Sequence, residues 1–201
     1  GIKPTYGLVS RRGVYPLAFS LDHIGPMCWT VRDCALMLQG MAGHDPDDPG
    51  SADRAVPDYA AALTGDVAGL RVGILRQFYE GDDRADPAML AAMAAAVATL
   101  GGLGARIEDV TLSPAEDYTA CGNILMLAEA VAVHEAEMRA RPERFGWILR
   151  ERLALGTLLS AADYIQASRL RRKLAAEMER ALERCDVLLM PGAWSTAPRE
   201  M

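Results

Sequence analysis

The stretch Leu70-Arg71-Val72-Gly73-Ile74-Leu75 is a short, mostly apolar run, which is typical of a buried β-strand. Downstream, Asp86-Pro87 combines an N-capping residue with a proline at the first helical position, so a helix is predicted to begin there. Gly101-Gly102 ends that helix, and residues 105–110 predict a second strand. A strand, a helix and a strand in this order form a βαβ unit, which implies a parallel pair of strands.

The segments on either side of this unit are also predicted to be regular. Thr30 stands three residues before Asp33, which is the spacing of a capping box and predicts a helix that begins after Thr30. Residues 115–184 have a mostly helical pattern. Residues 186–190 form a short apolar run before Pro191 and predict a further buried strand. The predicted fold class is therefore α/β.

Composition excludes several classes of protein. The chain has 201 residues, of which 27 are acidic and 21 are basic, and it is 51% hydrophobic with 6% aromatic residues. This composition supports a sizeable core and excludes a disordered or collagen-like chain. The net charge of −6 argues against general binding to nucleic acid or to anionic membranes. The four cysteines form no CxxC pair or zinc pattern, so we expect reduced thiols, no metal site and a cytoplasmic location.

Two charged segments need an explanation. The loop from His44 to Asp53 holds four aspartates, but its prolines break the spacing of an EF-hand, so we expect a solvated acidic turn. Residues 139–184 carry 11 basic and 6 acidic side chains. We expect solvated helix faces with ion pairs between neighbouring turns, and a surface that faces tRNA is the alternative.

Two stretches near the N-terminus carry a more specific signal. They are Gly1-Ile2-Lys3-Pro4-Thr5-Tyr6-Gly7-Leu8-Val9-Ser10-Arg11-Arg12-Gly13 and Ser20-Leu21-Asp22-His23-Ile24-Gly25-Pro26-Met27. They resemble consecutive segments of the amidase signature family, the first of which lies just downstream of the family's nucleophile. The specific similarity continues at residues 30–33 and 43–49, and looser similarity follows in order at residues 70–73, 164–172 and 186–189. The resemblance implies a layered α/β/α fold with a mixed sheet flanked by helices.

The family resemblance also implies a mechanism. Its members use a Ser–Ser–Lys triad, in which a serine attacks an amide carbonyl and water later clears the acyl-enzyme. All three triad residues would precede Gly1, and neither Lys3 nor Lys173 matches the family's base. We therefore expect residues 1–201 to be the central portion of a single amidase-signature domain, without the upstream catalytic segment and the closing C-terminal strands. On this view the chain holds no catalytic residue, needs no cofactor and is inactive alone.

Two residues are candidates for substrate binding. Arg152 lies in Arg150-Glu151-Arg152-Leu153-Ala154-Leu155-Gly156-Thr157, which resembles a segment of amidotransferase A subunits where an arginine pairs with a substrate carboxylate. An arginine fork suits a carboxylate because it donates two parallel hydrogen bonds. A surface salt bridge to Glu151 or a nearby acid is the alternative. Asp22 is the second candidate, and a turn-capping aspartate is its alternative.

The expected function of the parent protein is hydrolysis of a small-molecule carboxamide. One alternative is the glutaminase component of a tRNA-dependent amidotransferase, the only case in which we expect nucleic acid as a partner. The other alternative is a non-catalytic α/β binding or regulatory module, suggested by the βαβ unit at 70–110. We expect no membrane partner, and a homo-oligomer is left open.

Overall fold

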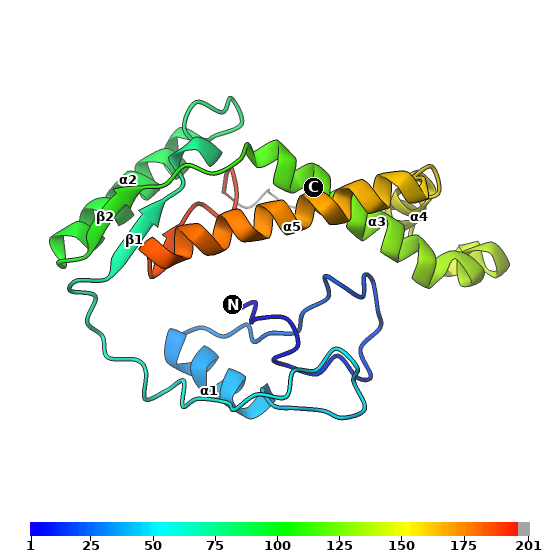
Figure 1. Ribbon diagram of the computed structural model, residues 1–201, viewed down its shortest axis with the longest axis horizontal. Coiled ribbons are helices and arrows are strands. Elements are labelled where there is room, and N and C mark those ends of the chain that lie inside the picture. The colour runs from blue at the N-terminus through cyan, green and yellow to red at the C-terminus, as the bar shows by residue number, and fades with distance from the viewer. Residues whose placement is uncertain (197–201) are drawn as a thin grey trace. The chain divides into compact units, whose positions relative to one another are not determined.

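The computed structural model describes residues 1–196 (Figure 1). These residues fall into two compact units. The loop unit consists of Gly1–Gly65 and Ile124–Tyr164, and the sheet unit consists of Asp66–Asn123 and the chain from Ile165 onward. None of the helices in the described part of the chain has the length and apolar composition that a membrane span requires.

The sheet unit is built on three strands, β1 (Arg71–Ile74), β2 (Arg106–Asp109) and β3 (Val187–Leu189). Their order is β2-β1-β3, and both pairings are parallel, with Val72 opposite Ile107 in the first. The predicted βαβ unit and the α/β class are confirmed. The expected mixed sheet differs in one respect, because these three strands pair only in parallel. Each connection between them passes through helices, which return the chain in the same direction.

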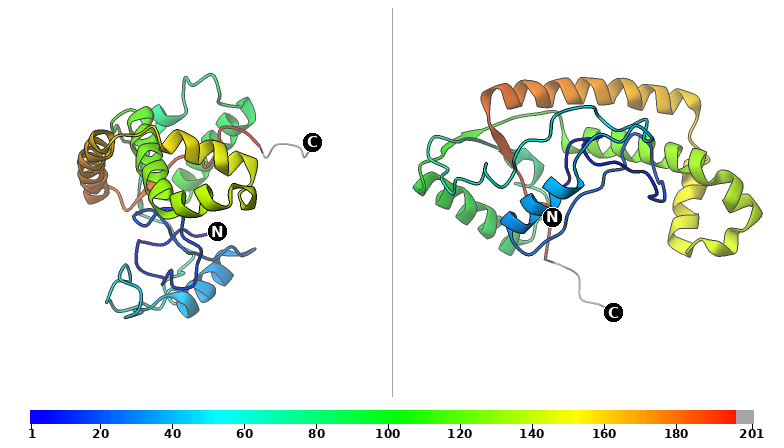
Figure 2. Two further views of the ribbon diagram at one scale, coloured as in Figure 1. Left: turned by 90° about the vertical axis from the view of Figure 1, so that its right-hand side faces the viewer. Right: turned by 90° about the horizontal axis from the view of Figure 1, so that it is seen from below.

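Helices cover both faces of this sheet (Figure 2). On one face, Val72 and Ile74 pack against α2 (Pro87–Gly102). On the other, Leu75 packs with residues of α5 (Ala161–Arg184). The alternation of side chains along β1 therefore produces an α/β/α sandwich in this unit. The predicted cap of α2 is confirmed, since Asp86 accepts a hydrogen bond of 2.7 Å from the N–H of Ala88.

The centre of the sheet unit is closely packed around Gly73. A Cβ atom at this position would lie 2.7 Å from side-chain atoms of Cys185, Leu188 and Val110. Cys185 is fully buried, and burial is the main cause that raises the pKa of its thiol to about 11. All four cysteines are free, as expected, and of these only Cys28 is partly exposed.

The loop unit contains α1 (Val31–Met41), α4 (Trp147–Gly156) and most of α3 (Ala115–Ala140). The cap predicted for α1 is confirmed, since Thr30 Oγ1 accepts from the N–H of Asp33 at 3.1 Å. Two 3₁₀ turns complete the helices, η1 (Arg76–Phe78) in the sheet unit and η2 (Pro142–Arg144) in the loop unit. Residues 1–27 and 44–65 form no helix or strand, so side-chain hydrogen bonds determine much of their conformation.

Candidate functional site

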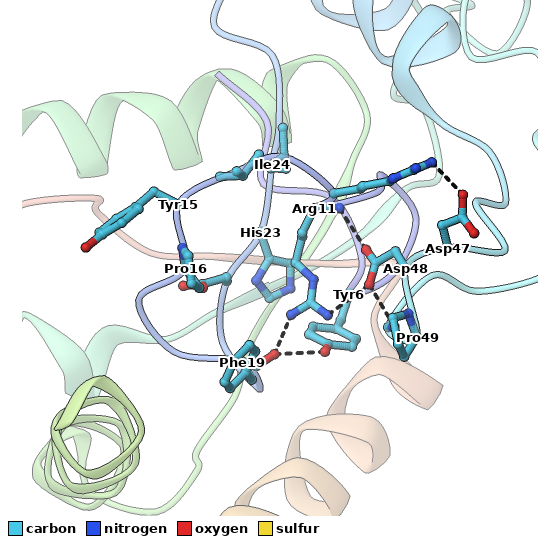
Figure 3. Close-up of a pocket in the computed structure, with 14 residues that line it drawn as sticks. Tyr6, Arg11, Tyr15, Pro16, Phe19, His23, Ile24, Asp47, Asp48 and Pro49 are labelled. Carbon is cyan, nitrogen blue, oxygen red and sulfur yellow. Dashed lines mark hydrogen bonds and ion pairs between the residues drawn. The ribbon is translucent and has the colours of Figure 1, made fainter. Parts of the chain in front are cut away.

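A cavity of about 580 Å³ lies in the loop unit (Figure 3). Its 14 lining residues come from two irregular segments, 6–24 and 47–50. The lining combines aromatic rings with charged groups of both signs. Small-molecule sites commonly have volumes of about 300–1,000 Å³ and few polar groups in a largely apolar wall. This cavity therefore has the size and lining of a site for a small ligand.

Arg11 is the central side chain of one wall. Its guanidinium donates to the carbonyl of Phe19, lies 3.4 Å from Asp48 Oδ1, and stacks 4.8 Å from the ring centre of Tyr6 (Figure 3). The Tyr6 hydroxyl donates to the same carbonyl at 2.8 Å. Gly50 leaves room for this arrangement, because a Cβ there would lie 2.0 Å from Arg11 Nη2. Arg11 is thus held in place by its neighbours and acts as a fixed part of the wall.

The acidic loop is anchored to the segment that carries Arg11. Asp48 accepts from the N–H groups of Arg11 and Gly50, each at 2.8 Å, and these bonds lower the pKa of its carboxyl group. Asp45 accepts from Ser10 Oγ at 2.7 Å, which is the main cause that lowers the pKa of Asp45. The predicted solvated turn is therefore wrong for Asp48, which is only 8% exposed. Main-chain N–H groups stabilise its charge away from water.

This anchoring predicts a specific response to acid. A carboxyl group whose pKa is lower in the folded state stabilises the fold above its unfolded pKa, and that contribution is lost as the pH falls through the folded value. We expect Asp48→Asn to lower the melting temperature at pH 7. The difference from the native chain should shrink as the pH falls below about 4, because the unfolded chain then binds a proton that the folded carboxylate does not yet bind. A difference that stays constant between pH 7 and pH 3 would contradict this role for Asp48.

Asp22, a predicted site residue, lines the cavity and also stabilises a turn. One of its carboxylate oxygens accepts from the N–H groups of Leu17 and Ala18 at 2.8 and 3.0 Å, and its own N–H donates to the carbonyl of Ala18. The geometry is that of a capped turn, so Asp22 fixes the backbone that carries Phe19. A direct contact between Asp22 and a substrate stays a prediction.

Gly25 and Pro26 hold the beginning of the chain. The N–H of Ile2 donates to the carbonyl of Pro26 at 2.9 Å. The two segments are so close that a Cβ atom on Gly25 would lie 1.9 Å from the carbonyl oxygen of Ile2 and 2.8 Å from Pro4 Cδ. Only glycine allows this approach. We call this contact the 2–26 pairing.

Arg152, the other predicted site residue, lies elsewhere in the loop unit. It is an exposed residue of α4 and is not among the residues that line the cavity with Asp22. Within residues 1–196, the ion pairs that the structure shows do not include one between Arg152 and Glu151 or another nearby acid. Binding of a substrate carboxylate by Arg152 stays a prediction.

Glu129 is an important residue that the sequence did not reveal. It is 9% exposed on α3, and its carboxylate accepts from Ser20 N at 2.8 Å, Ser20 Oγ at 2.6 Å and Tyr164 Oη at 3.1 Å. These bonds tie the turn capped by Asp22 to α3 and to the start of α5. A signal was present, since Glu129 is a lone charge within the apolar run at 127–133. Such a charge is buried only where partners satisfy it.

The chain's own hydroxyl and amine groups do not form a Ser–Ser–Lys set in the part that the structure describes. Lys3 Nζ donates to the carbonyl of Pro4 at 2.9 Å, and Lys173 is exposed on α5. Ser10 and Ser20 donate to carboxylates. These contacts suit the positioning of other groups, and the absence of catalytic residues from the chain stays a prediction.

Comparison with known proteins links this arrangement to a family. The family model described as amidase matches residues 1–201. An amidase of Pseudomonas putida is 43% identical over 192 residues, which cover 95% of this chain and 41% of that protein. The A subunit of the glutamyl-tRNA(Gln) amidotransferase of Pelobacter propionicus (strain DSM 2379 / NBRC 103807 / OttBd1) is 41% identical over 225 residues, which cover 99% of this chain and 46% of that subunit.

A solved structure has the same fold. It belongs to a vestigial protein complex described as revealing the evolutionary origins of an s-triazine catabolic enzyme. Its TM-score is 0.88 at 33% identity, over 98% of this chain and 42% of that one. The chain thus spans less than half the length of the relatives it matches.

Proposed function

Because this chain belongs to the amidase family, we propose that the complete protein hydrolyses the C–N bond of a small carboxamide. A serine attacks the carbonyl carbon, ammonia or an amine leaves, and water then hydrolyses the acyl-enzyme. The observation that carries this proposal is the family match along the whole chain, from residue 1 to residue 201. The two units are then parts of one amidase-signature domain, whose Ser–Ser–Lys triad lies outside these residues.

Within that enzyme, the loop unit would position the catalytic segment. By family resemblance, Gly1–Lys3 follow the nucleophile, and the 2–26 pairing holds these residues. The turn capped by Asp22, anchored in turn by Glu129, would support the same region. These contacts act on geometry, and displacement of a reacting group by about 1 Å can reduce a rate by about a hundredfold.

Release of ammonia from a panel of carboxamides tests the proposal. We expect the complete gene product to release ammonia from at least one of acetamide, benzamide, malonamate and glutamine. We expect residues 1–201 alone to release none above the buffer rate. Turnover by residues 1–201 alone would contradict the proposed location of the triad, and a folded complete protein without activity on any amide would contradict the function.

Arg152 provides a prediction about substrate charge. We expect Arg152→Ala to raise KM for malonamate and glutamine, which carry a carboxylate, roughly 10- to 100-fold, because a charge-assisted hydrogen bond contributes about 1.5–3 kcal/mol. KM for acetamide should not change. Arg150→Ala, a neighbouring arginine on the same helix, is the matched control. Equal effects of Arg152→Ala on charged and uncharged amides would assign Arg152 a structural role.

A second candidate is the glutaminase component of a tRNA-dependent amidotransferase, which is favoured by the similarity to the Pelobacter propionicus polypeptide. It predicts copurification with partner proteins, strong preference for glutamine, and tRNA binding that is lost at high salt. The basic helices offer limited support, since Arg139, Arg141 and Arg144 already form ion pairs with Glu135 and Glu137. A protein that is active without any partner would favour the simple amidase. Cytoplasmic location and homo-oligomer formation stay predictions.

A further inference from the structure

A second cavity, of about 230 Å³, lies wholly within the sheet unit. Its lining comes from the segments that follow the three strands. Phe78 follows β1, Tyr118 and Thr119 lie in the first turns of α3 after β2, and residues 190–194 follow β3. The cavity is therefore at the carboxyl edge of the parallel sheet.

The strand order indicates that the cavity lies where ligands commonly bind in α/β sheets. From the central strand β1, the chain crosses to β2 on one side and later reaches β3 on the other side. The gap between β1 and β3 is therefore the point where the connections diverge. In open α/β sheets, ligands bind outside the carboxyl ends of the strands at such a switch point. Phe78 and Trp194 approach the cavity from the ends of β1 and β3.

The cavity suits an uncharged group. No charged side chain is among the residues of the described range 1–196 that line it. The Tyr118 hydroxyl donates to Glu177 Oε2 at 3.0 Å. Burial is the main cause that raises the pKa of Tyr118 to about 12, so the phenol is neutral. The Thr119 hydroxyl donates to the carbonyl of Ala115 at 3.0 Å. The two hydroxyl groups are thus already bonded, and what is left for a ligand is mainly apolar surface.

Aromatic rings form much of this surface, and they are held in place. Phe78 and Tyr118 contact edge to face, with 5.7 Å between ring centres. Trp194 stacks under the Arg84 guanidinium at 4.5 Å, and its carbonyl accepts from the N–H of Asp86 at 2.9 Å. A further ring can pack against such rings edge to face or in an offset stack, which contributes energy beyond the area it buries. A buried apolar cavity of roughly 150 Å³ is enough to bind benzene, so one substituted ring fits the volume here.

We propose that this cavity binds the ring of an aromatic carboxamide, so that the protein prefers benzamide-like amides over acetamide. That the bound ring belongs to the substrate rests on the proposed amidase function. Binding of the ring itself needs only the sheet unit.

Fluorine NMR of the complete protein, the same sample that is assayed for ammonia release, tests this proposal after labelling with 5-fluorotryptophan. The variants Trp29→Phe, Trp147→Phe and Trp194→Phe each remove one signal and so assign the signals of these three tryptophans. We expect benzamide to shift the Trp194 signal in a saturable manner. The signals of Trp29, which is 99% exposed, and of Trp147 should not move. Acetamide at the same concentrations should shift none of them.

Two substitutions that fill the cavity test whether benzamide binds inside it. Ala115→Leu and Ala193→Leu place bulk in the lining from different segments, and we expect each to weaken benzamide binding at least tenfold. Ala175→Leu, at an exposed position of α5, is the matched control and should bind as the native chain does. Native-like binding by both cavity variants, or no saturable shift of Trp194, would overturn the proposal.

The same samples separate this proposal from the proposed function. Binding at Trp194 without ammonia release from any amide would contradict the amidase function. It would still support the proposal that the cavity binds an aromatic ring. Ammonia release from benzamide at the native rate in Ala115→Leu and Ala193→Leu would support the function and overturn the role of the cavity.

Discussion

Gly25→Ala is expected to lower the free energy of unfolding of the loop unit by about 3 kcal/mol, because the added methyl group forces the 2–26 pairing apart. The new Cβ would lie 1.9 Å from the Ile2 carbonyl oxygen, so the main chain itself has to move. Overpacking of this kind costs about 1–3 kcal/mol, and loss of the hydrogen bond from Ile2 to Pro26 adds about 1 kcal/mol. In the complete protein we expect ammonia release to fall roughly a hundredfold.

Chemical denaturation and ammonia release measure the two effects. The matched control is Gly40→Ala, since Gly40 lies near the end of α1 with no heavy atom within 4 Å of the new Cβ. We expect this control to stabilise the chain by up to about 1 kcal/mol, because alanine is the better helix former, and to keep full activity. If Gly25→Ala matched the native chain in both measurements, the 2–26 pairing would have no positioning role.

Glu129→Ala is expected to have a comparable effect on stability, again about 3 kcal/mol. The substitution removes the acceptor of bonds from Ser20 N, Ser20 Oγ and Tyr164 Oη, and each lost hydrogen bond costs about 1 kcal/mol or more when a donor stays buried. Hydrogen exchange should become faster at the amides of residues 17–22, because α3 no longer holds the turn that Asp22 caps.

Two further substitutions show whether the effect belongs to the buried carboxylate. Glu129→Gln keeps one acceptor oxygen and should have an intermediate effect. Glu135→Ala removes an exposed carboxylate of the same helix, paired with Arg139 at 2.6 Å, and should change stability by at most about 0.5 kcal/mol. Equal loss of stability in Glu129→Ala and Glu135→Ala would show that the contacts of Glu129 with Ser20 and Tyr164 contribute little.

The regular elements could be predicted because their signals are local. Thr30 and Asp86 cap helices through N–H groups two or three residues away, so their role is readable from spacing alone. The apolar run at 70–75 predicts β1 because a strand that is buried on both faces has a nearly continuous hydrophobic sequence. The parallel pairing follows from the helical connection between β1 and β2.

The site could be predicted only in part, because its key contacts join distant residues. Asp48 is 37 residues from Arg11, and Glu129 is 109 residues from Ser20. Spacing indicated a solvated acidic turn for Asp48 and said nothing of its partners. The structure also gives physical reasons for the segment at 20–27, in which Asp22 caps a turn and Gly25 permits the 2–26 pairing.

Capture of the acyl group by hydroxylamine tests the central claim, that this chain is part of a serine amidase, most directly. The complete gene product would be incubated with the panel of carboxamides and hydroxylamine, and hydroxamate, carboxylic acid and ammonia would be measured. We expect hydroxamate to form, and ammonia to equal the sum of hydroxamate and carboxylic acid, because hydroxylamine competes with water in attacking the acyl-enzyme. A folded protein that forms none of these products from any amide in the panel would contradict the claim.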